Sequence, residues 1–176
     1  MAVLRAAGYS GLVRADEGLY TYNDAAEKFL DGLGIRKNTA PAELNKKELF
    51  SRYCGRSELI VFGYQPLMVS AQCLRRNISS CDHLSQVQQL TDRTGKNFPV
   101  KSECVFCYNV LYNSTVLSLL DEAGTIKRMG FSSVRLAFTL ENAETVRETA
   151  ELAVKNFIYG KNLKYSQPHT KGHFNR

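Results

Sequence analysis

The chain has 176 residues, of which 44% are hydrophobic and 23% are charged, and this composition fits one ordinary domain with a sizeable core. No apolar run reaches the roughly 18 residues that a membrane span needs, and the apolar run at the start is too short for a signal peptide, so we expect a cytoplasmic protein with no membrane partner. The net charge of +6 favours polyanionic partners, RNA above all, although a solvated surface rich in lysine and arginine is the ordinary alternative.

The beginning of the chain predicts a helix followed by short strands. Residues 1–8 have apolar residues at helical spacing, whereas 12–14 and 19–22 have the pattern of short strands. Asp24, with Glu27 three residues later, has the pattern of a capping box that begins a helix. The predicted order at the end of this segment is therefore a strand and then a helix.

The same unit then repeats. Residues 39–44 predict a short strand, and Asn45, with Glu48 at the third helical position, predicts a second capped helix. Residues 58–64 (ELIVFGY) form the clearest strand pattern in the chain. Its centre is apolar on both faces, as is typical of a buried parallel strand.

Periodicity is lost after that strand, over residues 66–112, and this predicts a long cysteine-rich loop. Thr94-Gly95 has the chemistry of a turn and indicates a hairpin tip. Residues 108–120 predict a helix, and 133–139 the last strand. Asn142 then caps a final helix.

Strands that alternate with helices imply βαβ units and a parallel sheet. A complete (β/α)₈ barrel needs about 250 residues, so we expect an α/β fold that is either a small open domain or a partial TIM-like barrel. Residues 1–160 would form this domain, with 66–112 as its cysteine-rich insertion. The polar, basic tail 161–176 would begin a further segment.

Four of the five cysteines lie in the insertion. Seven residues separate Cys73 from Cys81, and two separate Cys104 from Cys107. The closely spaced pair suits chelation of one metal ion, and soft thiolates suit zinc and iron–sulfur clusters alike. Scattered buried thiols are the alternative, and Cys54, outside the insertion, is expected to be an incidental thiol.

Two further residues are candidates for catalysis. Glu43 follows a predicted strand and Arg135 lies in another, and residues near the carboxyl ends of strands reach the active sites of α/β barrels. Glu43 is therefore a candidate general base or substrate ligand, with an exposed carboxylate before a helix as the alternative. His83, two residues after Cys81, either replaces a cysteine ligand or lies at the surface.

Basic residues accompany the cysteines, and they are candidates for binding RNA phosphates or an anionic substrate. They are Arg75, Arg76, Arg93, Lys96 and Lys101. An ordinary solvated loop is the alternative. The chain contains neither an H-E-x-x-H nor a G-x-S-x-G motif, so no residue pattern supports proteolysis.

Several strings of this sequence resemble the collagenase-like peptidase family (the U-thirty-two peptidases), and they cover nearly the whole chain in the family's order. They are LYTYN (19–23), AELN (42–45), GYQPLMVSAQC (63–73), DRTGK (92–96), FPV (98–100), CVFCYN (104–109), YN (112–113) and TKGHF (170–174).

The resemblance implies the later part of a TIM-like barrel, whose preceding half would be carried by another polypeptide. It also implies an iron–sulfur cluster, of the [4Fe–4S] type, held by Cys73, Cys81, Cys104 and Cys107, with zinc as the alternative metal. The implied reaction is oxygen-independent hydroxylation of an RNA base. The peptidase activity of the family's name, and a non-catalytic metal-stabilised interaction module, are the other two expectations.

Overall fold

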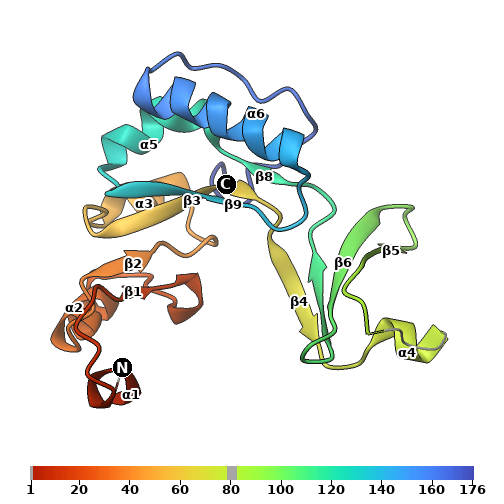
Figure 1. Ribbon diagram of the computed structural model, residues 1–176. Helices are drawn as coiled ribbons and strands as arrows, with labels where there is room; N and C mark the ends of the chain where they lie inside the picture. Colours follow the sequence, from red (N-terminus) through yellow and green to blue (C-terminus); the bar gives the residue numbers. More distant parts are fainter. Residues whose placement is uncertain (1, 79–82) are drawn as a thin grey trace.

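The computed structural model describes residues 2–78 and 83–176 of the chain. Within them the backbone forms two β-sheets, and β3 of the first continues almost directly into β4 of the second (Figure 1). One sheet is mainly parallel and is covered by helices, whereas the other is antiparallel and extends away from the helices as a wing. The fold is therefore mixed α/β, as predicted, but with two kinds of sheet.

The parallel sheet has its strands side by side in chain order, as β1 (Arg14–Ala15), β2 (Lys37–Thr39), β3 (Ser57–Gly63) and β9 (Ser133–Ala137). A short strand, β8 (Leu117–Ser118), pairs antiparallel with the end of β3. The strong strand predictions for β3 and β9 are confirmed, whereas β2 ends where its predicted strand begins. β1 and β9 are edges, so the described strands close no barrel.

The main core lies between the parallel sheet and the helices. Leu59 and Val61 of β3 are buried with Leu49, Ile126 and Ala153. These three side chains come from α3 (Lys46–Ser51), α5 (Ala123–Met129) and α6 (Ala143–Ala153), respectively. Alternate residues of β3 thus pack against three helices, and Figure 1 shows α5 and α6 over the same face of β3 and β9.

Helices α2, α3 and α6 begin at side-chain caps, and two of the three predicted caps are confirmed. Asn45 accepts hydrogen bonds at the start of α3, and Glu48 completes the capping box. Asn142 caps α6 in the same way. The cap of α2 (Asp24–Gly32) is Asn23 rather than Asp24, because Asn23 keeps an extended backbone while Asp24 is already helical.

The described part of residues 66–112 contains a four-stranded antiparallel sheet, so the prediction of a long loop is wrong. The strand order is β4 (Pro66–Ser70), β7 (Tyr108–Tyr112), β6 (Asn97–Glu103) and β5 (Val87–Thr91). A short helix, α4 (Leu74–Ile78), follows β4. The predicted tip at Thr94-Gly95 does connect β5 to β6. The wing leaves much of β4 and β5 exposed, so these strands lack the alternation that reveals a half-buried strand.

The helix predicted over residues 108–120 is also absent. Its apolar residues belong to β7 and β8, which are followed by a 3₁₀ turn, η2 (Leu120–Glu122). Tyr108–Tyr112 is rich in residues that favour strands, and its partners are distant in sequence, because β7 lies between β4 and β6. Tertiary pairing therefore outweighs the weak helical spacing.

The ends of the chain pack differently from one another. Helix α1 (Ala2–Ala6) has no buried residue, and a 3₁₀ turn, η1 (Glu17–Leu19), overlaps the start of the strand predicted at 19–22. The end of α6 continues as a π-helix, η3 (Val154–Ile158). The tail returns to the core, where Phe174 is buried. Within the described residues no helix is long and apolar enough to cross a membrane.

Candidate functional site

Three of the cysteines lie at the outer end of the antiparallel sheet. Cys104 and Cys107 belong to the four-residue turn between β6 and β7, and Cys73 follows β4. The end of β4 pairs with the beginning of β7, where the Asn109 side-chain amide donates a 2.6 Å hydrogen bond to the Gln72 carbonyl. The fold thus brings Cys73 to the end of the sheet that carries the Cys104–Cys107 turn.

The Cys104–Cys107 turn has an unusual backbone. Cys107 has a φ of 54°, the left-handed region that residues other than glycine adopt rarely. Its thiol is exposed and donates a hydrogen bond to the Cys104 carbonyl over 3.8 Å. Val105 and Phe106, between the two cysteines, are 83% and 77% exposed. Such strained, exposed turns concentrate at functional sites.

Cys81 lies outside the described residues, but the chain on either side of it is held at the same end of the sheet. Arg75, on α4, donates a 3.1 Å hydrogen bond to the Leu84 carbonyl, and the Cys104 N–H donates to the Ser85 hydroxyl over 3.4 Å. His83 is exposed. Among the described residues no group of three or more His, Cys, Asp or Glu side chains is gathered closely enough to hold a metal. The three described thiols suit a soft metal by their chemistry, and they lie at the same end of the sheet without forming a ligand group.

The basic residues of the wing fall into separate groups rather than one patch. Arg75 and Arg76 lie on α4 at the cysteine end, whereas Arg93 and Lys96 lie at the β5–β6 tip, a strand length or roughly 20 Å away. Lys101, on β6 between them, forms a 2.7 Å ion pair with Glu103. A single stretch of nucleic acid would have to run along the wing to meet both groups.

A pocket of about 320 Å³ lies at the carboxyl ends of the parallel strands. Glu17 follows β1, Glu43 follows β2 and Gln65 follows β3, and His173 of the tail closes the pocket. Its other lining residues are Gly18, Tyr20, Ala42, Pro66 and Leu67. Ligand sites are common at this edge of parallel sheets, so this pocket is the second part of the candidate site.

Two glutamates make the pocket acidic. Burial raises the pKa of Glu17, the negative charges of Asp16 and Glu43 act in the same direction, and the positive charge of Arg135 opposes them. A carboxyl group whose pKa is raised in a pocket is suited to exchange a proton with a substrate. The sequence pointed to Glu43 but missed Glu17, whose position directly after β1 becomes evident only when β1 is located.

Arg135 does not line this pocket. Its guanidinium group contacts Glu58 at 2.6 Å, Asp16 at 2.9 Å and the Thr39 hydroxyl at 3.0 Å. Although burial acts to raise the pKa of Asp16, the Glu17 backbone N–H and Arg135 lower it. Arg135 thus holds a charged Asp16 beside Glu17, which is a positioning role rather than contact with a substrate.

Two tyrosines form a flat aromatic surface at the pocket. The rings of Tyr20 and Tyr22 stack with their centroids 5.9 Å apart and an angle of 2° between their planes. Both side chains are exposed, and Tyr20 lines the pocket. Exposed aromatic rings of this kind are the surfaces on which proteins stack unpaired bases.

Cys54 is unsuited to reactive chemistry. Its side chain is buried, and burial raises the pKa of its thiol to about 11. Its thiol donates a hydrogen bond to the Leu49 carbonyl over 3.3 Å. Because the thiolate is the nucleophilic form, Cys54 is a packed core residue, consistent with its expected incidental role.

The chain matches no protein-family model, no curated protein and no solved structure. Folds host many unrelated activities, so the function is argued from the two parts of the site, the cysteine end of the wing and the acidic pocket.

Proposed function

We propose that this protein is an iron–sulfur enzyme component that hydroxylates an RNA base without molecular oxygen, with a co-substrate that gives up the oxygen atom and is thereby reduced by two electrons. Cys73, Cys81, Cys104 and Cys107 would hold a [4Fe–4S] cluster, which when bound supplies one-electron chemistry. The observation that supports the proposal is that Cys73 and the Cys104–Cys107 turn lie at the same end of the wing. Cys73 follows β4 and the Cys104–Cys107 turn follows β6, strands that are distant in sequence.

The acidic pocket supports a base as the substrate. Its volume of about 320 Å³ is near the lower end of the range for small-molecule sites. Tyr20 and Tyr22 offer a stacking surface, and Glu17 and Glu43 offer acceptors for the N–H groups of a base. Glu17, with its raised pKa, is the candidate acid or base for a proton at the substrate. The exposed Arg76 and Arg93 would contact phosphates.

We also propose that the parallel sheet is the later part of a TIM-like barrel, completed by a polypeptide that carries the preceding strands. Strands that follow one another in chain order, with helices on one face, are the arrangement of a barrel rather than of a doubly wound sheet. Large apolar residues are exposed near the β1 edge, among them Val3 at 81%, Leu12 at 68% and Phe29 at 68%. A partner packed at this edge would cover them.

Peptidase activity is the alternative that the resemblance carries. It would need an activated nucleophile, and the buried Cys54 thiol, with its pKa of about 11, is not one. An interaction module without catalysis is the other alternative, and the apolar side chains exposed on β4, Leu67, Met68 and Val69, would suit it.

The substrate is tested by mass spectrometry of RNA from cells with and without the gene. We expect one hydroxylated nucleoside to disappear with the gene and to return with the wild-type copy. A Glu17→Gln copy should restore less of the modification than the wild type, whereas Glu144→Gln, at an exposed position of α6, should restore it fully. An unchanged RNA profile together with impaired peptide turnover would contradict the proposal and favour the peptidase.

A further inference from the structure

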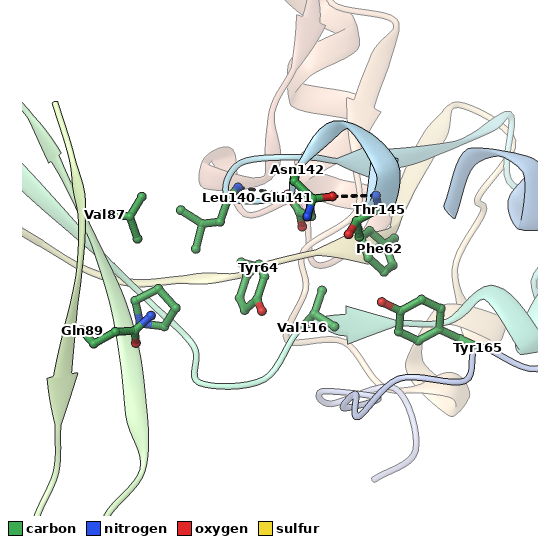
Figure 2. Close-up of a pocket in the computed structure, with 11 residues that line it drawn as sticks. Phe62, Tyr64, Val87, Gln89, Val116, Leu140, Glu141, Asn142, Thr145 and Tyr165 are labelled. Atoms are coloured by element: carbon green, nitrogen blue, oxygen red, sulfur yellow. Dashed lines mark hydrogen bonds between the residues drawn. The ribbon is translucent and has the colours of Figure 1, made fainter. Parts of the chain in front are cut away.

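A third region of the molecule has the features of a small-molecule site and belongs to neither part described above. It is a pocket of about 290 Å³ between the two sheets and the beginning of α6 (Figure 2). It is lined by Phe62, Tyr64, Val87, Gln89, Pro99, Val116, Leu140, Glu141, Asn142, Thr145 and Tyr165. We refer to it as the inter-sheet pocket.

Glu141 lines this pocket, and one of its carboxylate oxygens has no hydrogen bond among the described residues. One carboxylate oxygen, Oε2, accepts hydrogen bonds from the backbone N–H groups of Thr139 at 2.7 Å and Leu140 at 3.0 Å. These bonds fix the side chain just before the N-cap of α6. The other oxygen, Oε1, is buried and has no hydrogen-bond partner among the described residues. The turn before the helix supplies two N–H donors to Oε2 but none to Oε1. Buried acceptors without donors are rare.

Aromatic rings form the walls around this acceptor. The rings of Phe62 and Tyr165 meet edge to face, with centroids 5.4 Å apart. Figure 2 shows Tyr64 and Tyr165 on either side of Val116. Burial raises the pKa of both phenols, and the negative charge of Glu141 acts in the same direction. Both hydroxyl groups therefore lie within the field of the carboxylate.

The pocket carries negative charge in a positively charged protein. Among the described residues that line it, Glu141 is the only charged one, although the chain as a whole has a net charge of +6. Aromatic faces attract cations through their quadrupoles, and a buried carboxylate is best satisfied by a charged donor. The aromatic walls and the negative charge of Glu141 thus both favour a cationic ligand.

We propose that the inter-sheet pocket binds an organic cation with a protonated amine or guanidinium group. Its N–H groups pair with the Glu141 carboxylate, its charge lies beside the rings of Tyr64 and Tyr165, and its alkyl part contacts Phe62 and Val116. This site is independent of the proposed cluster and of RNA hydroxylation, because it shares no lining residue with the acidic pocket.

A neighbouring cavity extends the space open to such a ligand, and its charged lining residues, Glu148, Glu151, Lys155 and Lys164, balance one another. It has a volume of about 710 Å³, lies between α6 and the tail, and shares Tyr64, Val116, Thr145 and Tyr165 with the inter-sheet pocket. Glu148, seven residues after Glu141 and thus roughly 10 Å farther along the helix, lines this cavity and acts on the pKa of Tyr165. A ligand long enough to extend from the inter-sheet pocket into this cavity would reach Glu148 as well as Glu141.

The proposal is tested by isothermal titration calorimetry of the full chain with putrescine, spermidine, agmatine and a blocked arginine amide. We expect saturable binding of at least one of these cations, and no binding of neutral butanol. Spermidine binding tighter than the blocked arginine amide would identify a free amine as the source of the cation, and the reverse ranking a protein side chain. Failure of all four to bind at millimolar concentration would overturn the proposal.

A matched pair of variants tests the residue that the proposal depends on. Glu141→Gln keeps an oxygen for the two backbone N–H groups but removes the charge, so affinity should fall at least tenfold. Glu144→Gln, with an exposed side chain on the first turn of α6, should bind as the wild type does. Tyr165→Phe keeps the ring and should retain most of the affinity, and a thermal melt of each variant checks that it folds. Equal affinity of the Glu141→Gln and wild-type proteins would contradict the assignment.

Discussion

Glu17 and Glu43 show how one side chain can be inferred from the sequence while its neighbour cannot. Glu43 was identified because it follows a strand pattern and precedes a capped helix. Glu17 was missed although a short strand was predicted at 12–14, because β1 spans only Arg14–Ala15 and so short a strand does not fix where it ends. His173 was not predicted to line the pocket either, because it reaches the pocket only where the tail returns to the core.

The raised pKa of Glu17 predicts a pH dependence of stability. Its carboxyl group binds a proton more tightly in the folded state, so the stability that this gives is complete below the ordinary value of 4.5 and is lost as the pH rises through the raised pKa. Glu17→Gln should therefore gain stability relative to the wild type as the pH rises from about 4 to about 7. Urea denaturation across this range measures the difference, and a constant difference would contradict it.

Elements with a local signal were predictable, and those that depend on distant pairing were not. The apolar centre of β3 and the caps at Asn45 and Asn142 each lie within a few neighbouring residues. The antiparallel sheet, in contrast, pairs β4 with β7 across 37 intervening residues, those between Ser70 and Tyr108. Residues of β4 are exposed on both faces, so no burial pattern marks it.

Gly63 is the point where the two sheets meet, and its replacement should be costly. It has a φ of +142°, and a Cβ there would lie 2.3 Å from the Ala137 carbonyl oxygen of β9. Gly63→Ala should lower the free energy of unfolding by about 2 kcal/mol or more, because strain and a backbone clash combine. Thermal or urea denaturation measures this change.

Gly32 supplies the control, since it lies in α2 with no atom within 4 Å of its added Cβ. Gly32→Ala should raise stability by about 0.5–1 kcal/mol. If Gly63→Ala were as stable as the wild type, the close approach of β3 and β9 would be incorrect.

The whole molecule combines a helix-covered parallel sheet with an open wing, and the proposed RNA binding predicts a salt dependence that its exposed arginines determine. Arg76→Gln and Arg93→Gln, at opposite ends of the wing, should each lower the salt dependence of single-stranded RNA binding by about 0.7 in the slope of log K against log salt. Lys101→Gln should change it little, because Lys101 is paired with Glu103. Fluorescence anisotropy with a labelled RNA measures the slopes, and identical slopes for all three variants would exclude phosphate contacts along the wing.

The composition alone suggested an ordinary domain because it does not show which apolar residues are exposed at the sheet edges and on the wing. The apolar residues suffice for a core, but a part of them, including Leu67 and Val105, remains at the surface. Composition counts these side chains without locating them, and large exposed apolar surfaces are typical of sites that contact partners.

The central claim, a cluster at the cysteine end of the wing, is tested most directly by the metal content of the protein after anaerobic purification. We expect about four irons and four acid-labile sulfides per chain, lost in Cys104→Ser and retained in Cys54→Ser, whose thiol is buried away from the wing. A colourless protein that holds stoichiometric zinc, or iron that survives Cys104→Ser, would contradict the account.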